Sequence, residues 1–134
     1  MFKKVEHIGI AIKNLDKAES VFERLFGNNA YKREVVESEK VSTSFFKLGD
    51  TKIELLESDN DSSAISKFIT KKGEGIHHMA FEVDNIEDEL SRLKSEGFQL
   101  INEKPFKGAD NKLVAFIHPK SCHGILVELC QEIN

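Results

Sequence analysis

This sequence has few of the residues that mark membrane, secreted or disulfide-linked proteins. No apolar stretch approaches the roughly 20 residues of a membrane-spanning helix, and the first residues, MFKKVEHIGI, lack the apolar segment of a secretory signal. The two cysteines, Cys122 and Cys130, are too few for a disulfide framework and lack the paired spacing of a zinc ribbon. We therefore expect a cytoplasmic protein with reduced thiols and no membrane partner.

An excess of positive charge is also missing. The 19 Lys and Arg residues against 23 Asp and Glu residues give a net charge of 19 − 23 = −4, with both signs interleaved along the chain. A nucleic-acid partner requires a basic stripe, so we expect none. Hydrophobic residues make up 40% and charged residues 31% of the 134 residues, which is the balance of one compact globular domain spanning 1–134.

The chain contains an internal repeat that begins near its first histidine. The segment 5–16, VEHIGIAIKNLD, matches the segment 76–87, IHHMAFEVDNIE. This match places His7 on His78, an offset of 78 − 7 = 71 residues. Repeats at a fixed offset indicate duplicated supersecondary units, so the two halves should share one fold.

A second match lies near the end of each half. The segment 52–58, KIELLES, matches the segment 126–132, LVELCQE, and places Glu54 on Glu128 with an offset of 128 − 54 = 74. The drift of three residues between the offsets corresponds to one loop insertion. Each half therefore carries a histidine near its start and a glutamate near its end.

Both halves show the pattern of a strand, a helix and three further strands. In the first half the predicted helix begins at Asn14 or Asp16 and ends at Gly27, and the strands are 4–12, 30–39, 41–48 and 51–57. Gly49-Asp50 between the last two strands predicts a two-residue hairpin turn. In the second half the helix begins at Asn85 and ends at Gly97, and the strands are 76–83, 98–104, 112–118 and 124–131. The pattern predicts an α+β fold of two βαβββ modules, about 1–60 and 75–134, joined by a short helical linker.

Strand alternation places each repeated histidine on a face with small residues. Ile8, Ile10 and Ile12 suit packing against a helix, which leaves His7 beside Gly9 on the other face. The equivalent strand leaves His78 beside Ala80. A small residue beside each histidine leaves space above the sheet, which favours a concave surface that holds a ligand over a close-packed interior.

The repeated glutamates point to a shared cation. A lone strand histidine is usually a core residue and a lone strand glutamate usually faces solvent, but duplication of both favours one quasi-twofold site. A buried carboxylate needs a compensating charge, and two imidazoles with two carboxylates suit Co, Ni, Mn, Fe or Zn. His77, His118 and His123 lack repeat partners, so we interpret them as neighbours or surface residues.

Four stretches carry a resemblance to a known family: HIGIAIKNLDKA at 7–18, FFKLGDTKIELLE at 45–57, KKGEGIHHMAFEVDNI at 71–86 and FIHPKSCHGILVEL at 116–129. Together they resemble the vicinal oxygen chelate superfamily and, within it, the methylmalonyl-CoA epimerase family. The resemblance implies a curved mixed sheet with helices on its outer face, in a glyoxalase-like fold. It also implies an acyl-CoA substrate and a homodimer.

By the same resemblance the metal ligands are His7, Glu54, His78 and Glu128, and Glu128 is the catalytic base. The implied reaction interconverts the two epimers of methylmalonyl-CoA by proton abstraction alpha to a metal-bound thioester. Some relatives use a second glutamate on the third strand of the first module. This sequence has Ser42 and Thr43 in that region.

Three alternatives share the fold. Lactoylglutathione lyase, or glyoxalase I, isomerises a glutathione hemithioacetal with the same ligand set. An extradiol dioxygenase uses iron and three protein ligands. A non-catalytic small-molecule-binding protein of this fold uses an aromatic-lined cleft, for which a chain with no Trp and one Tyr offers little.

Overall fold

The computed structural model describes residues 1–134 and divides them into two compact units. Unit 1 comprises Met1–His7 and His78–Asn134, and unit 2 comprises Ile8–His77. The boundaries fall inside two strands, β1 (Phe2–Ala11) and β5 (Gly75–Val83). Each of these strands therefore contributes one part to each unit.

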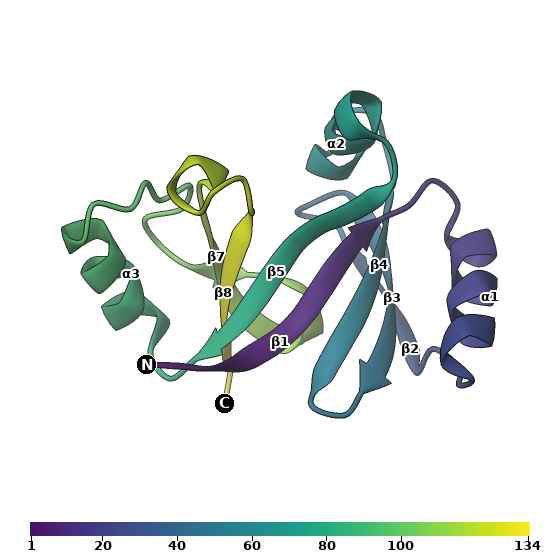
Figure 1. Ribbon diagram of the computed structural model, residues 1–134, viewed down its shortest axis with the longest axis horizontal. Coiled ribbons are helices and arrows are strands. Elements are labelled where there is room, and N and C mark those ends of the chain that lie inside the picture. Colours follow the sequence, from purple (N-terminus) through teal and green to yellow (C-terminus); the bar gives the residue numbers. More distant parts are fainter. The chain divides into compact units, whose positions relative to one another are not determined.

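Unit 2 holds the remaining elements of the first repeat (Figure 1). They are α1 (Leu15–Phe26), β2 (Lys32–Val36), β3 (Val41–Leu48), β4 (Thr51–Ser58) and, between the repeats, α2 (Ala64–Lys72). The strands β2, β3 and β4 form antiparallel ladders. Leu48 pairs with Thr51 across a two-residue turn in which Gly49 has φ 61°, which confirms the predicted hairpin.

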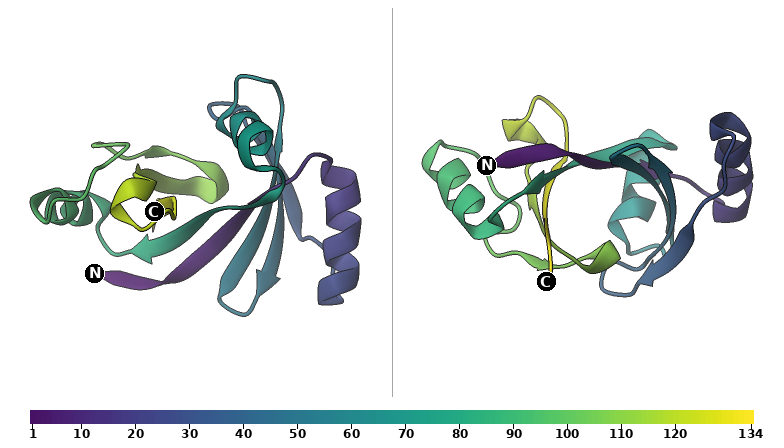
Figure 2. Two further views of the ribbon diagram at one scale, coloured as in Figure 1. Left: turned by 45° about the horizontal axis from the view of Figure 1, so that its top comes forward. Right: turned by 90° about the horizontal axis from the view of Figure 1, so that it is seen from below.

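The helix α1 begins and ends where the sequence predicts. The side chain of Asn14 accepts a hydrogen bond from the Lys17 amide, and Gly27 ends the helix in the left-handed conformation with φ 74°. The apolar face of the helix packs on the strands of unit 2 (Figure 2). The predicted helix-facing residues of β1 are confirmed in this core, which includes Ile8, Ile10, Ile12, Leu15, Phe22, Phe46 and Leu55.

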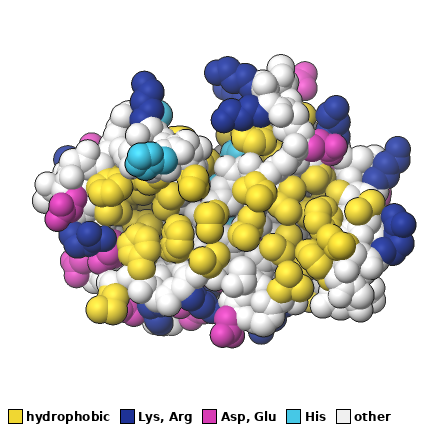
Figure 3. Space-filling view, in the orientation of Figure 1, with side chains coloured by type: hydrophobic (Ala, Val, Ile, Leu, Met, Phe, Trp, Pro, Cys, Tyr) yellow, Lys and Arg dark blue, Asp and Glu magenta, His cyan; other side chains and the backbone are white.

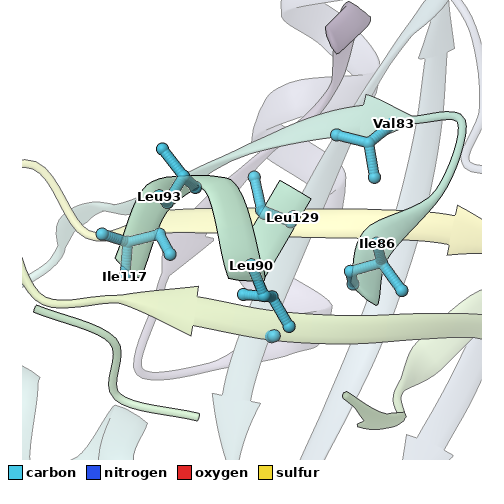
Figure 4. Close-up of a cluster of buried hydrophobic side chains, with 7 residues drawn as sticks. Val83, Ile86, Leu90, Leu93, Ile117 and Leu129 are labelled. Carbon is cyan, nitrogen blue, oxygen red and sulfur yellow. The ribbon is translucent and has the colours of Figure 1, made fainter. Parts of the chain in front are cut away.

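Unit 1 holds the second repeat: α3 (Ile86–Ser95), β6 (Phe106–Lys107), β7 (Lys112–Ile117) and β8 (Val127–Glu132). Asn85 caps α3 by accepting from the Asp88 amide. Figure 4 shows the core beneath this helix, where its apolar side chains meet those of the strands; the labelled residues are Val83, Ile86, Leu90, Leu93, Ile117 and Leu129.

The sheet is mixed, as predicted. The strand β5 pairs with β8 in parallel, whereas β7 pairs with β8 and with β6 antiparallel. Because β1 and β5 run through both units, the hydrogen-bonded order of the eight strands is β2-β3-β4-β1-β5-β8-β7-β6. The α+β, glyoxalase-like fold class is therefore confirmed.

The predicted strand at 98–104 is wrong. This segment makes only an isolated bridge, Leu100 with Ile117, and the strand that follows is the two-residue β6. The Asn102 side chain accepts from the Phe116 amide at 2.9 Å and so replaces a main-chain partner. Pro105, just before β6, has no amide hydrogen to donate. The residue types alternate like a strand, but side-chain and proline chemistry interrupt the ladder.

Both cysteines are free, and no helix has the length and apolar character needed to cross a membrane. Cys130 packs on Ala80 and Val114 in a small core cluster, and burial raises the pKa of its thiol to about 12.

Apolar side chains are numerous on the face shown in Figure 3. Surfaces of this kind often mark interaction sites, and the homodimer stays a prediction.

An ion-pair network ties α1 to two strands of unit 2. The Arg33 guanidinium on β2 donates from Nε to Glu19 at 2.8 Å and from a terminal nitrogen to Asp16 at 2.7 Å. The hydroxyl of Ser44 on β3 also donates to Glu19, at 2.5 Å. The hydrogen bond from Arg33, aided by Ser44, holds the pKa of the Glu19 carboxyl below its usual range, although burial opposes this shift.

We expect Glu19→Gln to lower the free energy of unfolding at neutral pH by about 1 kcal/mol. The folded-state pKa of Glu19 is depressed, so its contribution is present above the ordinary value near 4.5 and is lost as pH falls through the folded-state pKa. Urea unfolding of both proteins from neutral to acidic pH should therefore show a difference that shrinks with acidification. The exposed Glu37→Gln is the matched control, and a pH-independent difference for Glu19→Gln would contradict this account.

Candidate metal centre

Two histidines meet in unit 1 because of the register between β1 and β5. The strands β1 and β5 are hydrogen-bonded neighbours and run in opposite directions (Figure 1). The Asp84 amide donates to the Met1 carbonyl at 3.2 Å, so the numbers of paired residues sum to 1 + 84 = 85. His7 and His78 also sum to 7 + 78 = 85, and they therefore lie opposite each other. Their Nε2 atoms are 3.0 Å apart and their rings meet edge to face.

The carboxylate of Glu128 joins this pair from β8. Parallel pairing places Ala80 against Glu128, two residues beyond His78 along β5. The Oε1 atom of Glu128 lies 3.2 Å from Nε2 of His78, and its Oε2 atom lies 3.6 Å from Nε2 of His7. All three side chains are buried. Unit 1 thus gathers two imidazole nitrogens and one carboxylate from three predicted positions.

Glu54, the fourth predicted ligand, lies on β4 of unit 2. It pairs with Phe45 of β3 and is buried. Charged carboxylates are seldom fully buried without compensation. Glu54 is thus a buried carboxylate of unit 2, and His7 and His78 are buried imidazoles of unit 1.

The donor atoms of unit 1 fit a transition-metal ion. Two ligand atoms that each lie about 2.1 Å from one ion are separated by about 3.0 Å at a right angle and about 3.4 Å at a tetrahedral angle. The separations of 3.0, 3.2 and 3.6 Å in the structure lie around these values. Mixed imidazole and carboxylate donors suit Co, Ni, Mn or Zn better than Ca or Mg.

Two charged residues next to this cluster were missed by the sequence analysis. Oε1 of Glu6 lies 2.7 Å from Nδ1 of His7, and Nζ of Lys112 lies 4.0 Å from Oε2 of Glu6. Neighbouring residues of a strand point to opposite faces, so the alternation of β1 did not predict a contact between Glu6 and His7. The signal that could have found Glu6 is a carboxylate directly beside a candidate ligand, in the stretch VEHIGIA whose other side chains are apolar or small.

The histidines without repeat partners occupy other environments. The ring of His77 meets Phe68 edge to face, and burial lowers the pKa of His77 to about 4. His118 and His123 lie in the turn before β8; Nδ1 of His118 accepts from the Lys120 amide at 3.0 Å. The interpretation of His118 and His123 as residues outside the cluster agrees with these positions.

The region where a second glutamate was sought contains no carboxylate on β3. The hydroxyl of Thr43 donates to the Glu34 carbonyl at 3.0 Å, and that of Ser42 donates to Asp59 at 2.9 Å. Glu37 and Glu39 precede β3 in the turn after β2. Neither hydroxyl replaces a carboxylate as a proton acceptor at neutral pH, because a hydroxyl is a far weaker base.

The chain belongs to the glyoxalase/bleomycin resistance protein/dioxygenase superfamily, whose family model matches residues 6–116. Within that class it is similar to the mitochondrial methylmalonyl-CoA epimerase of Homo sapiens, with 37% identity over 129 residues, which cover 96% of this chain and 73% of the human protein. The resemblance seen in the sequence is confirmed.

Two further relatives extend this similarity. The uncharacterized protein YqjC of Bacillus subtilis is 39% identical over 128 residues, which cover 96% of this chain and 91% of that protein. A solved structure of methylmalonyl-CoA epimerase in complex with methylmalonyl-CoA and NH4+ superposes with a TM-score of 0.94 at 30% identity. That superposition covers 98% of this chain and 96% of the other.

We expect Co²⁺ to raise the melting temperature of the wild-type protein and to have little effect on His78→Gln. An ion that binds only the native state adds about 2.7 kcal/mol at a free concentration of 100 times Kd. Thermal unfolding with and without Co²⁺ measures this effect. The control is His123→Asn, because His123 has φ 54° and Asn tolerates that conformation. An equal Co²⁺-dependent shift in wild type and His78→Gln would exclude His78 as a ligand.

Proposed function

We propose that this protein is a metal-dependent methylmalonyl-CoA epimerase that interconverts the 2R and 2S epimers of its substrate. The observation that carries the proposal is the buried Glu128 carboxylate, which lies within 3.2 and 3.6 Å of two imidazole nitrogens. A carboxylate in this setting can serve as a base beside a metal ion. The similarity to methylmalonyl-CoA epimerases over nearly the whole chain supports the choice of substrate.

Four residues would hold the ion: His7, Glu54, His78 and Glu128. His7, His78 and Glu128 form the cluster of unit 1. Glu54 is proposed because the repeat aligns it with Glu128 and because its carboxylate is buried. A divalent ion held by these residues would supply Lewis-acid chemistry, which stabilises negative charge on a thioester oxygen.

Glu128 is proposed to move the proton at carbon 2. Its two carboxylate oxygens face different histidines, so one oxygen can face the ion while the other accepts the proton. Because Glu128 is buried, its carboxylate is largely shielded from bulk water. Return of a proton to the opposite face of carbon 2 inverts the centre.

A single carboxylate is proposed to serve both directions. Ser42 and Thr43 stand in the region where some relatives carry a second glutamate, and their hydroxyls donate to Asp59 and to the Glu34 carbonyl. A two-base mechanism therefore lacks its second carboxylate on β3. In the proposed mechanism the planar intermediate either turns before Glu128 returns the proton, or takes its proton from a water molecule on the face opposite to Glu128.

Epimerase turnover should depend on the metal. We expect protein stripped of metal by a chelator to lose turnover of 2R-methylmalonyl-CoA and to regain it when Co²⁺ is restored. Formation of the 2S epimer, followed by circular dichroism as the two epimers equilibrate, measures the rate. The glutathione hemithioacetal of methylglyoxal is the comparison substrate, since glyoxalase I shares the fold. Turnover of the hemithioacetal without turnover of methylmalonyl-CoA would replace the epimerase proposal with the lyase.

Glu128→Gln should lose exchange of the carbon-2 proton with deuterated water by at least about 100-fold, because the general base is removed. Mass spectrometry of each epimer, incubated separately, measures the exchange. The matched control is Glu132→Gln, which changes the largely exposed glutamate at the end of the same strand. Loss of exchange from both epimers is expected for one base. Exchange retained in one epimer only would mean that a second base exists.

A further inference from the structure

A buried carboxylate lies directly behind one of the proposed metal ligands. Glu6 on β1 has an exposed fraction of only 2%. Its Oε1 atom lies 2.7 Å from Nδ1 of His7, on the side of the ring away from Nε2. The Nε2 atom of the same ring faces His78 and Glu128. His7 is thus held between a carboxylate and the cluster.

A buried lysine compensates the charge of Glu6. Lys112 on β7 has an exposed fraction of 5%, and its Nζ atom lies 4.0 Å from Oε2 of Glu6. The same Nζ atom lies 3.3 Å from Glu132 and 4.0 Å from Glu82. Removing a carboxylate from water costs several kcal/mol unless an opposite charge accompanies it. Lys112 supplies that charge from the neighbouring part of unit 1.

The chemistry of the Glu6 to His7 contact fixes one tautomer of the ring. An ionised carboxylate can only accept hydrogen bonds, so Nδ1 of His7 must be the donor. In a neutral imidazole the other nitrogen, Nε2, then carries the lone pair. That lone pair is directed at the cluster, which is the orientation that a metal ligand needs. Carboxylates that orient ligating histidines in this way also raise their basicity.

We propose that Glu6 is a positioning residue that holds His7 as the Nδ1–H tautomer, and that Lys112 holds Glu6. This inference rests on the proposed metal centre, since it assigns a role toward one of its ligands. A purely structural role explains the arrangement less well. An apolar residue at this strand position would pack without the cost of burying two charges.

The test begins with the metal-free protein labelled with ¹⁵N in histidine. Long-range ¹H–¹⁵N correlation spectra distinguish the two neutral tautomers of His7. We expect the wild type to carry the proton on Nδ1. We expect Glu6→Gln to give a mixture of tautomers, because the Gln amide can both accept from Nδ1 and donate to it. A structural role alone leaves the tautomer unchanged.

Metal affinity provides the second readout. We expect Glu6→Gln to raise the Kd for Co²⁺ by 10- to 100-fold, which is about the usual effect of losing a partner that orients a ligating histidine. Competition with a chelator of known affinity measures the Kd. The double variant Glu6→Gln/Lys112→Met removes the charge pair together and keeps the test valid if Lys112 without Glu6 prevents folding. It should show the same tautomer change and the same loss of affinity.

Glu82→Gln is the matched control. Glu82 and Glu6 both lie 4.0 Å from Nζ of Lys112. The second ion pair of Glu82 is with Lys3, whereas the second contact of Glu6 is with His7. We expect its substitution to leave the His7 tautomer and the Co²⁺ affinity at wild-type values. A loss of affinity equal to that of Glu6→Gln would assign the effect to the charge around Lys112 and overturn the role of Glu6.

The outcomes separate this inference from the proposed function. Wild-type tautomer and affinity in Glu6→Gln would overturn the positioning role and leave the epimerase proposal intact. Wild-type protein that binds Co²⁺ with a fixed Nδ1–H tautomer of His7, yet fails to epimerise methylmalonyl-CoA, would overturn the proposed reaction and support the role of Glu6.

Discussion

The candidate site depends on the antiparallel register between the start of β1 and the end of β5. That register places His7 opposite His78, and parallel pairing of β5 with β8 then delivers Glu128 to the same place. A slip of one residue in either ladder would turn a side chain to the other face of the sheet. The core beneath α3 opposes such a slip, because Val83 of β5 and Leu129 of β8 are buried in it and would be displaced.

Much of the fold could be predicted because local signals and the repeat agree. Asn14 and Asn85 cap the two predicted helices, and Gly49 forms the predicted hairpin turn. The strand predicted at 98–104 failed because the period of apolar residues does not report hydrogen-bond partners. The Asn102 side chain takes the Phe116 amide that a strand would have used. Tertiary contacts of this kind override alternation.

The site was predicted in part for a related reason. Duplication pointed to His7, His78 and Glu128, which unit 1 brings together, and to Glu54 on β4. It could not point to Glu6, which has no acidic counterpart at the equivalent position, His77. Nor could it find Lys112, whose partner carboxylates come from distant parts of the sequence. Residues that support a ligand leave no trace in a repeat when only one half carries them.

The span of chain that separates the cluster residues has a consequence for folding. His7 and His78 are 71 residues apart, and Glu128 follows 128 − 78 = 50 residues later. Closing loops of this length is entropically costly and makes the assembly of such sheets slow. The three clustered side chains therefore come together only late in folding, when both ends of the chain have joined the sheet. If they bind an ion as proposed, partly folded chains would lack a high-affinity site for it, and ion binding would follow the assembly of unit 1.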